Sequence, residues 1–406
     1  MPERIAHLES GKRLLWSVLD QVVYGASNIL VVSQFARSAS GPELAHISAA
    51  YATVTIAIAV TRGALSEVII SSNETYDDHD RINANARVIL LILMAPIAVL
   101  LGTLLIFEIG TPSIMLAGIP LLVVQDRLRF EWIQAGQTYR ALWLDTTWLA
   151  GQVALLLAAG SLISPSSDIA ASCWLGGCAC SLLFAKRVRA PYRISDARRW
   201  ILENRSPVLL TVGQVAAVMV AAQTPVFVFG MTGNPTAAAG YLAAAQALSP
   251  QTAMLIAFRP LVLRNLALQR QTLSNRLVLR ASLTQAVPLL VGGITVGWLA
   301  LSLLGEKFYG DQVSNAAMEI VWWLACTRAL GALSLVFVGL LRVAGQWRSV
   351  LHGELLTSLI LGGLPILVVQ ISRQPGAIAA AQAVGALLSV AIWWRVTYTR
   401  SARYRS

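Results

Sequence analysis

The sequence consists of long apolar runs separated by short polar segments. A helix needs about 20 predominantly apolar residues to cross the ~30 Å hydrocarbon core of a bilayer. By this criterion the pattern predicts twelve membrane-spanning helices. Their predicted limits are 14–36, 44–68, 87–108, 112–132, 141–161, 168–185, 207–231, 236–258, 281–304, 315–341, 349–370 and 375–397.

The composition supports an integral membrane protein. The chain has 406 residues, of which 56% are hydrophobic and 13% are charged, whereas about a quarter of the residues in a soluble domain are charged. We therefore expect an all-α membrane protein. An even number of spans places both termini on the same side of the membrane.

The basic residues predict the orientation. Of the 31 lysines and arginines, Arg328 lies in the middle of a span, and only Arg37, Lys307 and Arg373 lie on the predicted outer side. All the others lie on the opposite side, as the positive-inside rule requires of the cytoplasmic face. We expect a multi-pass protein of the plasma (inner) membrane with both termini cytoplasmic. The net charge of +11 then follows from topology, and no nucleic-acid partner is expected, because the cations are spread over short loops.

Two short polar segments suggest an internal repeat. AGQTYR, beginning at Ala135, lies between predicted spans four and five, and AGQWR, beginning at Ala344, lies between spans ten and eleven. Gln21 in span one and Gln214 in span seven are related by a similar offset. The match indicates two halves of six spans each.

Halves with an even number of spans point the same way across the bilayer, so we expect a pseudo-two-fold axis along the membrane normal, which is a transporter plan. The predicted parts are an N-terminal lobe at 1–185, a basic cytoplasmic linker at 186–206, and a C-terminal lobe with a basic tail at 207–406. We expect an interfacial helix within the linker, around Asp196 to Glu203.

The four cysteines do not form a metal-binding motif. They all fall inside predicted spans and lack the histidine or second cysteine pair of a zinc site. They are Cys173, Cys178, Cys180 and Cys326. No metal and no cofactor is predicted.

Two functional classes fit the sequence poorly. A polyprenyl-dependent glycosyltransferase needs acidic catalytic residues in a substantial outer loop, but the outer loops are short, with only Glu306 and Asp311 beside Lys307. We therefore expect no enzymatic activity. A major-facilitator carrier has a Gly- and Arg-rich motif between spans two and three, where this chain has SSNETYDDHDRINANAR. That carrier class remains an alternative.

The segment QDRLRFEWIQAGQTYRALWLDTTW, from Gln125 to Trp148, resembles bacterial polysaccharide-biosynthesis flippases. These form the Wzx-like branch of the multidrug/oligosaccharidyl-lipid/polysaccharide exporter superfamily. VTRGALSEVII near span two and AFRPLVL near span eight are similar to the same family.

The resemblance implies two six-helix lobes around a V-shaped cavity that opens alternately to each side. It also implies a function: flipping of an oligosaccharide linked to a polyprenyl phosphate from the cytoplasmic to the outer leaflet. Polysaccharide polymerase or glycosyltransferase machinery would be its partners. A drug or cation antiporter of the same superfamily is the alternative.

Arg328 is the main candidate for binding substrate phosphate, because it lies far from either end of span ten and snorkelling does not free a cation at that depth. The competing interpretation is a buried ion pair with Glu319 or with an acid on another helix. Arg62 and Arg259, at the inner ends of spans two and eight, are further phosphate candidates or, alternatively, interfacial anchors.

The remaining candidates are amides and acids within or near spans. Gln214, Gln223 and Gln246 are predicted to replace the hydration of the sugar, or else to support tight polar packing, and prolines nearby allow helix bending. Asp20 and Gln21 form a predicted proton or cation site, because an intramembrane acid is a functional hypothesis by default; Asp20 paired with a loop arginine is the alternative. Asp126 and Arg129 belong to a predicted intracellular gate or a solvated helix end.

Overall fold

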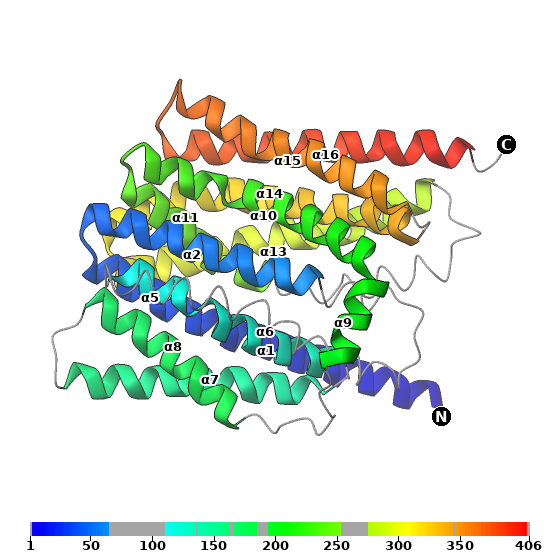
Figure 1. Ribbon diagram of the computed structural model, residues 1–406. Helices are drawn as coiled ribbons and strands as arrows, with labels where there is room; N and C mark the ends of the chain where they lie inside the picture. Colours follow the sequence, from blue (N-terminus) through cyan, green and yellow to red (C-terminus); the bar gives the residue numbers. More distant parts are fainter. Residues whose placement is uncertain are drawn as a thin grey trace. The chain divides into compact units, whose positions relative to one another are not determined.

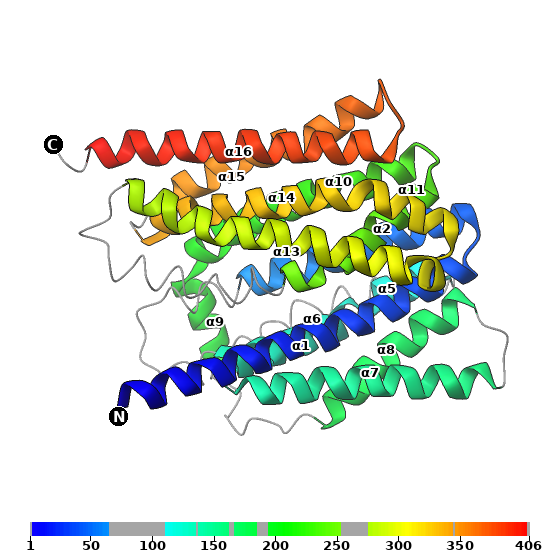
Figure 2. The same ribbon diagram turned by 180° about the vertical axis from the view of Figure 1, so that it is seen from behind.

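The structure is a computed structural model that describes residues 2–64, 110–134, 137–161, 166–184, 194–252, 275–343 and 346–403 (Figures 1 and 2). These residues contain helices and turns but no strand. Among them, seven helices are long and apolar enough to cross a membrane. The protein is therefore an all-α membrane protein, as the sequence predicted.

The helices follow the predicted spans. Their bounds are α1 Pro2–Ser38, α2 Gly41–Arg62, α5 Thr111–Ala117, α6 Ile119–Gln134, α7 Thr138–Gly160, α8 Ser167–Phe184, α9 Ile194–Glu203, α10 Arg205–Met231, α11 Pro235–Ala247, α13 Asn275–Tyr309, α14 Asp311–Val343, α15 Trp347–Val369 and α16 Pro375–Arg403. Each predicted span coincides with one or two of these helices except 87–108, which lies outside the described residues.

The structure corrects two of the predicted spans. The predicted span 112–132 is interrupted at Gly118, where α5 ends and α6 begins. The predicted span 236–258 is interrupted at Leu248, and the residues after 252 lie outside the described part. Pro250 explains the second break, because a proline within a helix removes a backbone hydrogen bond and its ring clashes with the preceding turn.

The chain divides into two compact units, an N-unit of Met1–Ala216 and a C-unit of Ala217–Ser406. The division falls within α10, so the predicted boundaries at 185 and 206 stay predictions. The helix expected within the linker is present as α9.

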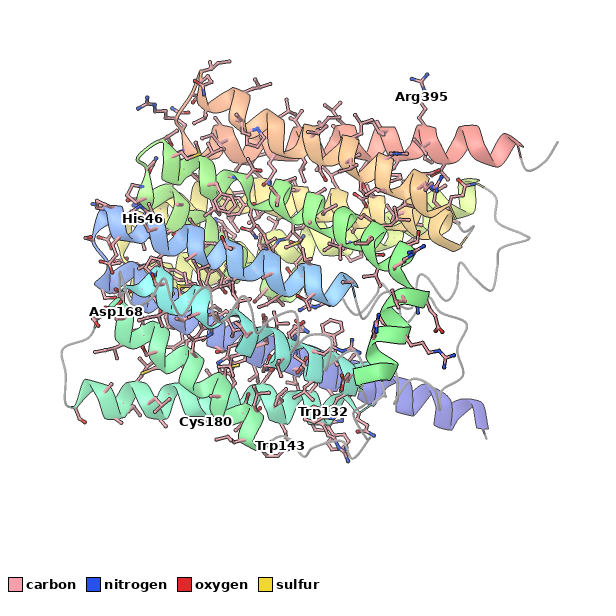
Figure 3. The ribbon with its side chains drawn as sticks, in the orientation of Figure 1. His46, Trp132, Trp143, Asp168, Cys180 and Arg395 are labelled. Atoms are coloured by element: carbon pink, nitrogen blue, oxygen red, sulfur yellow. The ribbon has the colours of Figure 1, made fainter. Side chains whose placement is uncertain are left out.

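Close helix contacts hold the N-unit together. α7 packs on both α8 and α1, and the contact with α8 depends on Gly177, where an added Cβ would come within 2.6 Å of the Trp148 carbonyl oxygen. Trp148 and Trp174 are buried side by side, with ring centroids 5.8 Å apart. Trp143, on the same helix α7, is 68% exposed and projects from the bundle (Figure 3), as is typical of a tryptophan at a membrane interface.

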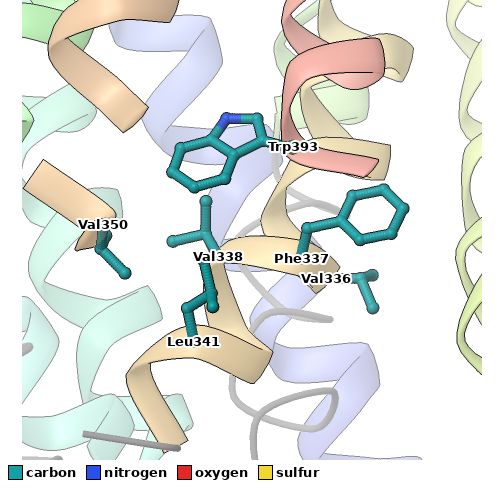
Figure 4. Packing of buried hydrophobic residues seen from close by; sticks show 6 residues of the cluster. All are labelled: Val336, Phe337, Val338, Leu341, Val350 and Trp393. Atoms are coloured by element: carbon teal, nitrogen blue, oxygen red, sulfur yellow. The ribbon is translucent and has the colours of Figure 1, made fainter. Parts of the chain in front are cut away.

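In the C-unit, α14 is the central helix and packs against α11, α13 and α16. An added Cβ on Gly240 of α11 would come within 2.7 Å of the Cβ of Ala316 on α14, so only glycine allows the two helices to approach this closely. Towards the other end of α14, Phe337 and Leu341 pack with Val350 of α15 and Trp393 of α16 (Figure 4).

The glutamines of the two AGQ segments, Gln137 and Gln346, have the same local structure in the two units. Gln137 has φ −95° and ψ 45° and precedes α7, while Gln346 has φ −89° and ψ 49° and precedes α15. The Gln137 N–H donates to the Trp132 carbonyl at 2.7 Å, and the Gln346 N–H donates to the Leu341 carbonyl at 2.9 Å. Each bond spans five residues and ends one helix before the next begins. This equivalence confirms the repeat at these positions.

Candidate functional site: two arginines within the helices

A buried cluster of charges joins three helices of the N-unit. Arg129 on α6 lies with Asp20 on α1 and Asp145 on α7, and all three side chains are buried. The Arg129 Nε lies 3.0 Å from Asp20 Oδ2 and 2.8 Å from Asp145 Oδ2. Its guanidinium also lies over the Tyr24 ring, 4.5 Å from the centroid. One arginine thus bridges two carboxylates inside the bundle.

A second ion pair joins Arg62 to Asp126, which lies on the same helix α6 as Arg129. The Arg62 Nε at the end of α2 donates to Asp126 Oδ2 at 3.1 Å, and the Arg62 guanidinium lies over the Phe130 ring, 4.3 Å from its centroid. Gln125 Nε2 donates to Asp145 Oδ1 at 2.6 Å. The neighbouring positions 125, 126 and 129 of α6 therefore link α6 to three other helices, α1, α2 and α7.

The charges of the first cluster do not balance. Two carboxylates, Asp20 and Asp145, share one guanidinium, and Asp20 Oδ1 has no hydrogen-bond partner among the residues that the structure describes. An uncompensated charge in a buried site is costly. A bound proton or a small cation would neutralise the surplus, so this arrangement can hold one exchangeable positive charge. Gln21 lies beside it, with its Nε2 3.5 Å from Asp20 Oδ2.

The structure decides between several sequence-based alternatives for the N-unit. Asp20 pairs with Arg129 within the helices, not with a loop arginine. The predicted solvated helix end around Asp126 and Arg129 is wrong, because both side chains are buried. Arg62 is half-buried and forms an ion pair in addition to any contact with the interface. The gating role of these residues stays a prediction.

Arg328 has a different environment in the C-unit. Its Nη1 donates to the Leu248 carbonyl and to Thr252 Oγ1, both at 2.8 Å, and its Nη2 donates to the Ala245 carbonyl at 3.1 Å. The ion pair of the competing interpretation, with Glu319 or an acid on another helix, is not seen: among the described residues, no carboxylate forms an ion pair with Arg328. The cation is therefore held by neutral groups of α11 and the turn after it.

The two carbonyls that accept from Arg328 lie near the end of α11 and just after it, and the Leu248 carbonyl also accepts from the Thr252 N–H at 3.2 Å. The last carbonyls of a helix lack intrahelical donors and are satisfied by other groups, and a cation is favourable at a helix C-terminus. Because Pro250 interrupts the helix after Ala247, Arg328 of α14 fills this role in the middle of the C-unit. A guanidinium has five N–H donors, and the three contacts above leave donors for a further group.

The predicted glutamines are placed differently from one another. Gln214 is buried in α10, and Gln246 of α11 is partly buried. Gln223 is also partly buried, and its Oε1 has no hydrogen-bond partner among the described residues. Arg259 lies outside the described residues.

The sequence analysis did not select two of the central residues. Asp145 lies within a predicted span, so the rule that marks Asp20 as an intramembrane acid also applies to it. Gln382 of α16 is buried and bonds to α10, but a single glutamine in an apolar helix has no sequence signal that separates it from ordinary packing.

Together these features define the class of the molecule: a helical membrane protein of two compact units, with the buried Arg129 linking α1, α6 and α7 in one unit and the partly buried Arg328 linking α14 to α11 in the other. No protein-family model matches the sequence, and no curated protein with a similar sequence was found.

Solved structures identify the fold. The chain is similar to the inward-facing conformation of a multidrug resistance MATE family transporter of the MOP superfamily, with a TM-score of 0.64, 14% identity, and coverage of 95% of this chain and 96% of that one. It is similar to the lipid II flippase MurJ in an inward closed conformation, with a TM-score of 0.62, 13% identity and coverage of 93% and 86%. A MOP superfamily transporter from Pyrococcus furiosus matches with a TM-score of 0.56, 13% identity and coverage of 98% and 96%. The chain therefore has the fold of these transporters over nearly its whole length.

Proposed function

We propose that this protein is a transporter of the MOP superfamily that flips a polyprenyl-phosphate-linked oligosaccharide from the cytoplasmic to the outer leaflet. Flipping makes and breaks no covalent bond. It requires a cation for the phosphate, polar groups for the sugar, and a path for the charged headgroup through the membrane.

Arg328 is the observation that carries this proposal. It is a cation inside the C-unit whose recorded partners are two carbonyls and a hydroxyl. Neutral acceptors leave its charge uncompensated, so an anionic ligand gains a full Coulombic interaction there. A guanidinium also binds phosphate through two parallel hydrogen bonds. The likeness to a structure described as a lipid II flippase supports the same cargo class.

The amides provide the complementary part of the proposed site. Gln214 and Gln223 of α10, with Gln246 of α11, would bind hydroxyl groups of the glycan. Arg62 and Arg259 would receive the phosphate near the cytoplasmic mouth. The Asp20 and Asp145 pair would take up a proton or a cation and so couple transport to an ion gradient, with Gln21, Asp126 and Arg129 in coupling and gating roles.

Reconstitution tests the proposal directly. The purified full-length protein in liposomes should make a lipid-linked oligosaccharide accessible to an externally added glycosidase, at a rate above that of protein-free liposomes. Liposomes that contain a folded unrelated membrane protein serve as the control. The same accessibility in protein and control liposomes would contradict the proposal.

A drug or cation antiporter is the second candidate function. Its supporting observation is the surplus carboxylate in the N-unit, which favours a cationic ligand, together with the likeness to a multidrug resistance MATE family transporter. The same liposomes separate the two functions. Counter-transport of a fluorescent organic cation without glycosidase accessibility would favour the antiporter.

The proposed direction of transport requires an inner-membrane protein with cytoplasmic termini. Reporters fused between Lys186 and Arg205 should read cytoplasmic, and reporters at Gly233 or Gly310 should read external. An external signal from the first segment would reverse the orientation. Polysaccharide polymerase or glycosyltransferase machinery remains the proposed partner on either side of the flipping step.

A further inference from the structure

A polar contact in the C-unit lies at the proline of α10. Pro225 has no N–H, so the Ala221 carbonyl four residues earlier has no backbone donor. Gln382 of α16 provides one: its Nε2 donates to the Ala221 carbonyl at 3.2 Å and to the Ala222 carbonyl at 3.0 Å. A side chain of another helix thus replaces the amide that α10 lacks.

Tyr241 of α11 completes this group. Its hydroxyl oxygen lies 2.8 Å from the Ala222 carbonyl oxygen and 2.9 Å from Gln382 Oε1. The single hydroxyl hydrogen can be donated to either of these two acceptors. Both Tyr241 and Gln382 are buried, at 3% and 1% exposed. Buried polar groups that satisfy one another fix a geometry, whereas a missing partner costs the desolvation of the group left behind.

The neighbouring helix α15 approaches α10 at the same level. An added Cβ on Gly362 of α15 would lie 3.0 Å from Thr224 Oγ1 and 3.3 Å from the Ala221 Cα. The proline turn of α10 is therefore contacted by α15 on one side and hydrogen-bonded by α11 and α16. A helix in which every carbonyl has its backbone donor does not need such a side-chain hydrogen bond from another helix.

We propose that Gln382 is a positioning residue that acts in place of the missing amide at Pro225 and, with Tyr241, forms a releasable clasp on α10. Closed, the clasp keeps α10 helical through Pro225 and fixes the position of the adjacent Gln223. Open, it leaves a hinge, because the Ala221 carbonyl has lost the donor that replaces the missing amide of Pro225. The role of Gln223 rests on the proposed flippase function; the clasp itself does not.

Hydrogen exchange of the full-length protein in lipid nanodiscs tests the clasp without any substrate. Gln382→Met keeps the length of the side chain but removes its donors. Amides of α10 in the segment 217–230 should exchange about tenfold faster than in the wild type. In the variant, local opening of the helix no longer has to break the hydrogen bonds that Gln382 donates to α10. Ser389→Ala on the same helix α16 is the matched control, since the Ser389 hydroxyl donates to the Gly385 carbonyl within α16 and, among the described residues, to no other helix. It should leave the exchange of α10 unchanged.

Pro225→Ala provides the decisive background, because it restores the backbone donor. There, Gln382→Met should change the exchange of the segment less than about threefold. If Gln382→Met fails to accumulate, Tyr241→Phe, which keeps the ring and loses one hydroxyl, should accelerate exchange in the same segment about threefold. Wild-type exchange in the variants, or an equal acceleration with alanine at 225, would overturn the proposal.

Flipping measurements separate the clasp from the function. Gln382→Met should raise the half-saturating substrate concentration, because Gln223 is no longer fixed, whereas Ser389→Ala should not. If exchange is faster in Gln382→Met and the wild-type protein shows no flipping, the flippase proposal is refuted and the clasp stands. Unchanged exchange alongside active flipping would refute only the clasp.

Discussion

Each of the two units has an arginine within its helices, Arg129 buried and Arg328 partly buried, but the surroundings of the two arginines are opposite. In the N-unit, Arg129 lies between two carboxylates, so the site has one negative charge in excess. In the C-unit, Arg328 lies among two carbonyls and a hydroxyl, so the site has one positive charge in excess within the part of the chain that the structure describes. The comparison shows that an arginine within a helix bundle does not by itself indicate a function, because its partners determine whether its charge is compensated.

This difference predicts different roles for the two arginines. Removing one partner of a buried ion pair leaves an uncompensated charge and is strongly destabilising. Removing a cation that only neutral groups hold leaves no charge behind. Arg129 should therefore be needed for stability, and Arg328 for binding an anion.

Arg129→Gln should have the largest effect on stability. It leaves Asp20 and Asp145 buried without a cation, at a cost of about 3–5 kcal/mol in the free energy of unfolding. Thermal unfolding of the purified protein in detergent measures this cost. Arg199→Gln on α9 is the control, because Arg199 forms an exposed pair with Glu203, a type of pair worth about 0.3–0.5 kcal/mol. Equal midpoints for the two variants would contradict the assigned role of Arg129.

Asp145→Asn should be much milder than Arg129→Gln. It leaves one carboxylate for one guanidinium, but the single amide oxygen can accept from Gln125 or from Arg129 and not from both, so the loss of stability should be about 1–2 kcal/mol. The same thermal unfolding experiment compares the two variants. A loss as large as that of Arg129→Gln would show that the site has no surplus charge. Transport driven by an ion gradient should be lost in Asp145→Asn, which a downhill flipping assay separates from loss of fold.

Thr252→Val should have the smallest effect. It removes one neutral acceptor of Arg328 and keeps two carbonyls, so it should cost about 1 kcal/mol of stability. Flipping should change only a few-fold, since the charge remains. Complete loss of flipping in a well-folded Thr252→Val protein would mean that the geometry of the turn after α11, more than the charge of Arg328, determines binding.

Much of the fold could be predicted from the sequence, because apolar runs and cation placement are both imposed by the bilayer. The repeat could be predicted as well, since the segments at Gln137 and Gln346 share both sequence and backbone geometry. The pairing partners could not. Asp20, Arg129 and Asp145 are far apart in the chain, and only the packing of α1, α6 and α7 brings them together.

The alternatives for Arg328 show the same limit. Its depth in a span predicted a special environment, but an ion pair and a substrate site have the same sequence signal. The observed partners are the Thr252 hydroxyl and two backbone carbonyls at the end of α11, and a backbone carbonyl can come from any residue type. Likewise, Gln382 acts on a carbonyl of α10 that is available only because Pro225 follows four residues later.

The flipping rate of Arg328→Gln, measured in liposomes beside the amount of folded protein, tests the central claim most directly. The variant should insert and accumulate normally, because an arginine at the centre of a membrane costs at least about 2.5 kcal/mol that glutamine largely avoids. It should flip lipid-linked oligosaccharide no faster than protein-free liposomes, while Arg328→Lys, which keeps the charge and loses the planar fork, should be partly active. Flipping at the wild-type rate by well-folded Arg328→Gln protein would contradict the assignment of Arg328 as the phosphate-binding residue.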